Sequence, residues 1–85
     1  MEKRVTVINE HGLHARPAGI LVKAVGTFKS TIELQTDKKT VNARSLMSVM
    51  ALGLTHGAEV TLIAKGEDEA LALETLSALF AAKFE

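Results

Sequence analysis

The apolar residues of this chain change their spacing several times, from every second residue to every third or fourth and back, and this limits the folds it can adopt. Alternation predicts strands over about 3–8, 32–35, 40–43 and 60–64. Helical spacing predicts helices over about 15–28, over 46–53 and from Asp68 onward. The polar link 36–39 makes the second and third strands a hairpin.

Each of the two longer helices is expected to carry one buried stripe. In the first helix, before an end signal at Gly26, the stripe is Ala18, Leu21, Val22 and Val25. In the last helix it is Ala72, Leu73, Leu76, Leu79 and Phe80. The order β-α-β-β-α-β-α, with one apolar face per strand, predicts a two-layer α/β sandwich with a mostly or wholly antiparallel sheet. With 85 residues, a single domain over 1–85 is expected.

The charge balance and the aromatic content exclude several functional classes. Ten basic residues balance ten acidic ones, and all three aromatic residues are Phe, so nothing favours a nucleic-acid surface. No apolar stretch approaches the ~20 residues that span a bilayer, and the N-terminal residues have no signal-peptide core. Cysteine is absent, which excludes thiolate zinc. We therefore expect a cytoplasmic protein that binds neither membranes nor nucleic acid.

The segment 12–18 has the composition of a phosphate site. Gly12 forms a turn that brings His14 to the start of a helix, and Pro17 fits the first turn of that helix. Free N–H groups and the positive end of the helix dipole favour an anion there. Arg16 adds a planar fork of donors, and a neutral imidazole nitrogen is a nucleophile. These features suit a transient phosphohistidine on His14, and with no nucleotide-binding loop the phosphoryl donor must be a partner protein.

Two other interpretations of this segment remain open from spacing alone. His14 can be a simple helix cap, with Arg16 a solvated charge. His11 and His14 can also form a metal-binding pair, but no third ligand is evident nearby, so neither a metal nor another cofactor is expected.

The segment 45–53 is apolar nearly all round, although a surface helix needs only one apolar stripe. Ser45 is the natural N-cap of this helix. Exposed apolar residues that include flexible Met47 and Met50 are typical of a protein-contact surface. The alternative is that long neighbouring side chains cover the patch.

Together, 12–18 and 39–47 resemble the active-site and regulatory-serine motifs of HPr, the histidine phosphocarrier family of the bacterial sugar phosphotransferase system. The segment 57–61 and the last helix also fit, so the resemblance covers essentially the whole chain. It implies an open-faced sandwich whose four-stranded antiparallel sheet, in order 1-4-2-3, is covered on one face by three helices. It also implies a carrier rather than an enzyme.

The resemblance further implies partners and residue roles. Phosphorylated enzyme I would pass its phosphoryl group to Nδ1 of His14, with Arg16 as phosphate partner, and the carrier would then phosphorylate enzyme IIA domains. Ser45 would be the target of a serine kinase/phosphorylase, and its phospho-form would bind a catabolite-control transcription factor. The expected partner-binding residues are Ala15, Pro17, Ile20, Leu46, Met47 and Met50. Ile20 lies off the buried stripe and should be exposed, and a monomer suits a shuttle.

Departures from the family pattern leave two related functions open. His11 and Ser48 stand where the family usually has other residues, which affects partner choice. One alternative is a regulatory HPr-like binding domain that acts only through Ser45, although such a relative does not need His14. The other is the nitrogen-branch paralogue, which the end of the chain over 79–84 slightly resembles, whereas the Ser45 segment favours the sugar branch.

Overall fold

Four strands form one antiparallel sheet in the order β1-β4-β2-β3. The computed structural model describes residues 1–85. Its elements, in chain order, are β1 (Glu2–Thr6), α1 (Ala15–Val25), β2 (Thr31–Gln35), β3 (Thr40–Asn42), α2 (Leu46–Ala51), β4 (Glu59–Lys65) and α3 (Glu69–Ala81). This confirms the predicted element order, the hairpin and the strand order that the resemblance implied.

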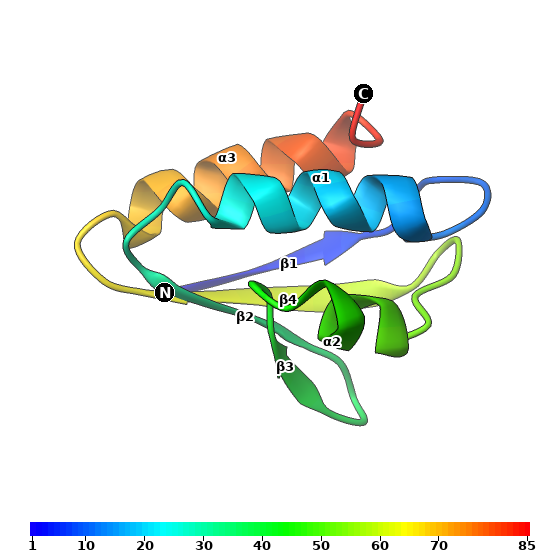
Figure 1. Ribbon diagram of the computed structural model, residues 1–85, viewed down its shortest axis with the longest axis horizontal. Coiled ribbons are helices and arrows are strands. Elements are labelled where there is room, and N and C mark those ends of the chain that lie inside the picture. The colour runs from blue at the N-terminus through cyan, green and yellow to red at the C-terminus, as the bar shows by residue number, and fades with distance from the viewer.

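The helices all pack on one face of the sheet, and the other face is open. Figure 1 shows α1 and α3 side by side and antiparallel above the sheet, while α2 packs against α1 and β3. The core between the layers is built from the inward residues of the strands, such as Val60, Leu62 and Ala64, and from the buried stripes of the helices. Burial of this apolar surface is the main stabilising term for the fold. The two-layer open-faced sandwich is therefore confirmed.

Strand register follows the alternation of apolar residues. Val5 lies opposite Val60, and Leu34 lies opposite Leu62, so inward residues face one another across the ladder. The first strand is shorter than the predicted 3–8, because the regular ladder ends at Thr6. Val7 still exchanges backbone hydrogen bonds with the 57–58 turn and is fully buried, whereas Ile8 is exposed.

The helix ends differ in detail from the prediction. Gly26 does end α1, but with an ordinary right-handed φ of −63°, so a glycine is not needed for its conformation. Val22 and Leu79 are only half-buried, and the predicted stripes did not include the buried Pro17. None of the three helices combines the length and the apolar content of a membrane span.

Candidate functional site

A tightly packed glycine turn fixes the backbone that leads into α1. Gly12 has a left-handed φ of +70°, and a Cβ placed there would lie 2.3 Å from the carbonyl oxygen of Leu54. The N–H of the next residue, Leu13, donates to that same oxygen over 2.9 Å, and the Leu13 side chain is buried. Only glycine combines this conformation with so close an approach. The packing of Gly12 and the hydrogen bond of Leu13 thus hold the turn against Leu54 just before His14.

His14 is the N-cap residue of α1, but its side chain does not cap the helix. Its backbone is extended, with φ −81° and ψ −168°, and its carbonyl accepts the first helical hydrogen bond, from the N–H of Ala18 over 2.9 Å. The exposed imidazole makes no capping hydrogen bond. His14 therefore occupies the cap position without capping the helix through its side chain, and its imidazole is exposed.

The imidazole borders a small cleft of about 170 Å³ at the start of α1. Arg16 lines the same cleft, is exposed, and takes part in neither of the two ion pairs of the structure. The first N–H groups of an α-helix have no partner within the helix, and the dipole adds positive potential there. The cleft therefore combines a free nucleophile, a free guanidinium and helix N–H groups, an arrangement suited to a phosphoryl group.

Four further residues of this cleft were not identified from the sequence. Asn9 comes from the turn before His14, and the other three, Lys83, Phe84 and Glu85, come from the segment after α3. The carboxamide of Asn9 donates a hydrogen bond to the carbonyl of Lys83 over 3.0 Å. No sequence motif joins these residues, which are 74 positions apart.

His11 is the neighbour of His14 on the side of the turn. Their ring centroids lie 6.3 Å apart, and the planes are inclined at 65°. No group of three His, Cys, Asp or Glu side chains comes together anywhere in the structure in a way that would hold a metal ion. The pair is thus two adjacent imidazoles without a third ligand.

The second predicted segment forms an exposed apolar surface beside α1. Ser45 is the N-cap of α2, and its hydroxyl oxygen accepts a hydrogen bond from the N–H of Ser48 over 3.2 Å, as predicted. Only Val49 of this helix is buried, whereas Leu46 and Met50 are 42% exposed and Met47 is 83% exposed. The alternative that neighbouring side chains cover this helix is therefore wrong.

Of the expected partner-binding residues on α1, only Ala15 is exposed. Ile20, expected to be exposed, is half-buried and packs against the core, because it lies at the edge of the buried stripe beside Leu21. Pro17 is buried, although its ring lines the cleft. Ile20 thus contributes the apolar wall of the cleft, on the side of α1 that carries His14.

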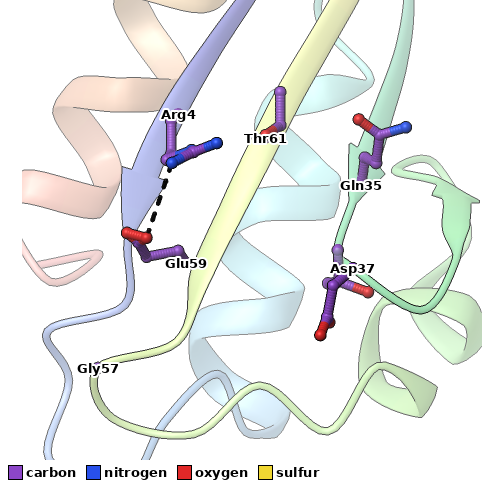
Figure 2. Close-up of a pocket in the computed structure, with 7 residues that line it drawn as sticks. Arg4, Gln35, Asp37, Gly57, Glu59 and Thr61 are labelled. Carbon is purple, nitrogen blue, oxygen red and sulfur yellow. Dashed lines mark ion pairs between the residues drawn. The ribbon is translucent and has the colours of Figure 1, made fainter.

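A second hollow, of about 610 Å³, lies on the open face of the sheet and includes none of these residues. Figure 2 shows its polar lining, with the ion pair between Arg4 and Glu59 at 3.9 Å. No apolar side chain lines it, and none of its side-chain atoms is buried without a partner. It therefore lacks the buried, convergent groups that are typical of a ligand site.

Comparisons with known proteins give one consistent result. The family model described as "PTS HPr component phosphorylation site" matches residues 1–82. The chain is 46% identical over 83 residues to the phosphocarrier protein HPr of Treponema pallidum (strain Nichols), covering 98% of this chain and 94% of that one.

Two solved structures extend this result. The crystal structure of HPr from Thermoanaerobacter tengcongensis superposes with a TM-score of 0.95 at 42% identity, covering 99% of this chain and 94% of that one. The Bacillus subtilis catabolite-repression protein Crh, crystallised as a domain-swapped dimer, gives a TM-score of 0.79 at 46% identity, covering 95% of this chain and 93% of that one.

Proposed function

The chain belongs to the HPr family of phosphocarriers of the phosphotransferase system, and we propose that it carries a phosphoryl group on His14 from phosphorylated enzyme I to enzyme IIA domains of sugar permeases. It is a carrier, not an enzyme. The observation that supports His14 as the acceptor is its free, exposed imidazole at the N-cap of α1, in one cleft with Arg16.

The proposed transfer is a displacement at phosphorus. The lone pair of a neutral ring nitrogen of His14 forms the new P–N bond. The bond from phosphorus to the donor atom of enzyme I breaks, and its electron pair leaves with the donor. The proton on the other ring nitrogen of His14 passes to solvent, and the donor takes up one proton. Arg16 and the N–H groups at the start of α1 neutralise the charge of the arriving phosphoryl oxygens.

Both partners must cover His14 in turn, because the group passes directly between two active sites. The exposed face of α2, with Leu46, Met47 and Met50, lies beside α1 and supplies the apolar part of the proposed docking surface. Ala15 and the exposed edge of Ile20 complete it near the cleft. We propose that the chain acts as a monomer in the cytoplasm, since each copy must present this one surface to successive partners.

A second function is favoured by the similarity to Crh and by the position of Ser45. As N-cap of α2, Ser45 lies directly beside the docking surface, so a phosphate there would change which partners bind. We propose that a serine kinase/phosphorylase modifies Ser45 and that the phospho-form binds a catabolite-control transcription factor. A purely regulatory role does not require the free imidazole of His14, and for this reason the carrier function is preferred.

The carrier function is tested with purified enzyme I of a bacterial phosphotransferase system and radiolabelled phosphoenolpyruvate. The wild-type chain should take up label that is labile in acid and stable in base, as a phosphoramidate is. His14→Ala should take up none and should keep the wild-type circular dichroism and Tm, because the imidazole is exposed and makes no hydrogen bond. His11→Ala and His56→Ala are the matched controls and should still be labelled. Equal labelling of His14→Ala and wild type would refute the assignment.

A further inference from the structure

The segment after α3 folds back on itself in an unusual backbone conformation. Lys83 and Phe84 have φ values of 58° and 60° and are the only non-glycine residues with positive φ. Non-glycine residues rarely adopt this conformation unless other contacts hold them there. Here Phe84 supplies such contacts: its side chain is 4% exposed, its ring packs edge-on 4.8 Å from that of Phe80, and its N–H donates to the carbonyl of Leu79 over 2.8 Å. We call residues 82–85 the C-terminal hook.

The hook lies at the same end of the molecule as the start of α1, as Figure 1 shows. Asn9 joins the two: its side-chain NH₂ donates to the carbonyl of Lys83 over 3.0 Å, and its own carbonyl accepts from Gly12 in the turn before His14. The carboxamide oxygen of Asn9 is buried without a hydrogen-bond partner. Buried side-chain oxygens without a hydrogen-bond partner are rare in folded proteins. The backbone of Lys83 is thus held at a fixed place relative to His14.

The hook brings a second cationic residue to the lining of the cleft. His14, Arg16 and Lys83 all line the same space of about 170 Å³. Lys83 takes part in neither of the two ion pairs, which join the terminal ammonium of Met1 to Glu69 and Arg4 to Glu59. The ammonium of Lys83 is carried on a flexible four-carbon stem, so it can turn toward an anion bound in this small cleft. Glu85 is the only acidic side chain of the lining, so the cations outnumber it.

We propose that Lys83 is a phosphate-binding residue, which contacts the phosphoryl group once it is on His14, and that Asn9 positions Lys83 for this contact. The inference rests on the proposed carrier function of His14. Since Lys83 binds the phosphoryl group and not the free imidazole, it stabilises the phosphorylated form over the unphosphorylated one. It acts as a point charge, in contrast to the planar fork of Arg16, so its effect should decrease as salt screens it.

The test measures the equilibrium constant for phosphoryl transfer between phosphorylated enzyme I and the chain. At equilibrium, the contribution of docking cancels and only the stability of the phospho-form remains. Lys83→Met keeps most of the apolar stem and removes the charge. Because exposed ion pairs contribute little, Lys83→Met should lower the equilibrium constant for transfer only about two- to fivefold at low salt. The loss should shrink at high salt, and Lys83→Arg should restore the wild-type value.

Two comparisons separate a specific contact from a general charge effect. Lys23→Met, an exposed lysine in the last turn of α1 that does not line the cleft, should leave the constant unchanged. Asn9→Ala should lower the constant in the wild-type background and add nothing in the Lys83→Met background, because its effect acts through Lys83. Thermal melts of every variant verify that the fold is intact.

The outcomes distinguish this proposal from the carrier function. Suppose that His14 of the wild-type chain takes up acid-labile label as expected. An unchanged equilibrium constant in Lys83→Met, or an equal loss in Lys23→Met, then overturns the assignment of Lys83 alone. Absence of labelling on His14 of the wild-type chain overturns both.

Discussion

The carboxylate of Asp68 accepts hydrogen bonds from both the backbone N–H and the hydroxyl of Ser30. Its second oxygen accepts from the N–H of Lys29 over 2.9 Å. Asp68 precedes α3, whereas Ser30 precedes β2, so these bonds tie the two layers together at the end of the molecule far from His14. The loop before α3 also packs closely here, since a Cβ on Gly66 would lie 2.7 Å from the Cα of Ser30.

Replacement of this carboxylate should lower stability in a pH-dependent way. The hydrogen bond from the Ser30 hydroxyl, followed by that from the Lys29 N–H, lowers the pKa of Asp68 from its ordinary value of 3.8. A lowered folded-state pKa contributes stability that is fully present above about pH 4 and is lost as the pH falls through the folded-state pKa. Asp68→Asn should therefore lower the Tm at pH 7, and this loss should be smaller at pH 3, where part of the contribution of the charged carboxylate is already gone.

The matched control is Glu67→Gln, an exposed acid next to Asp68 for which no hydrogen bond is present. It should leave the Tm nearly unchanged at both pH values, as an ordinary surface substitution does. Thermal denaturation followed by circular dichroism measures all three proteins. An equal loss in Tm for Asp68→Asn at pH 3 and pH 7 would contradict the role of the charged carboxylate.

The contacts of Asp68 and of the hook could not be predicted from the sequence. Alternation and helical spacing predicted every strand and the two long helices, because an apolar face of each must be buried, and an apolar run predicted α2. The position of Asp68 at the start of a helix was predicted, but its carboxylate bonds a loop 38 residues away instead of capping α3. Lys83 and Phe84 adopt left-handed backbone without glycine or asparagine to signal it, so the contribution of the hook to the cleft was not predicted.

His14, Arg16 and the exposed α2 surface could be predicted because each depends on local chemistry. A glycine turn before a helix start indicates where His14 and Arg16 lie, and the contact with Leu54 that holds this turn could not be predicted. The α2 surface is apolar on more faces than the core can cover. The strand order, in contrast, is a long-range property: it followed from the family resemblance and not from the spacing of residues.

Arg16 should matter more for phosphoryl transfer than for stability. It is exposed and unpaired, so Arg16→Lys should change the free energy of unfolding by no more than about 0.5 kcal/mol. Lysine keeps the charge but loses the planar fork, so transfer from enzyme I should slow by about three- to tenfold. Arg16→Ala should slow it further. Rapid-quench measurement of the phosphorylated fraction gives the rates, and a wild-type rate in Arg16→Ala would remove Arg16 from the site.

A charge on the exposed face of α2 should weaken docking without harming the fold. Met47 is 83% exposed, so Met47→Glu leaves the core intact but places a charge where an apolar contact is expected. Substitution of one important interface residue typically costs enough binding free energy that the Kd for enzyme I should rise about tenfold. Leu71→Glu, on α3, is the matched control: Leu71 is also an exposed apolar residue, but it lies outside the proposed docking surface. Titration calorimetry should find the Kd of Leu71→Glu for enzyme I unchanged. Equal weakening of binding by both variants would argue against the proposed docking surface.

Ser45→Asp should separate the structural role of Ser45 from its proposed regulatory role. The hydroxyl oxygen of Ser45 accepts from the N–H of Ser48, and an aspartate carboxylate can do the same at a helix N-cap. The negative charge is also favourable at the start of a helix. The Tm should therefore be unchanged or slightly raised.

The same charge should oppose docking, because Ser45 adjoins Leu46 and Met47 on the surface that enzyme I is proposed to cover. Burying a carboxylate against an apolar partner surface costs its hydration. Ser45→Asp should therefore accept phosphate from enzyme I at least about tenfold more slowly than wild type. Ser45→Asn provides a neutral cap of the same shape and should transfer at nearly the wild-type rate, which isolates the charge from the change of side chain. If Ser45→Asp transfers as fast as Ser45→Asn, or if its Tm falls by many degrees, Ser45 serves only as the cap of α2.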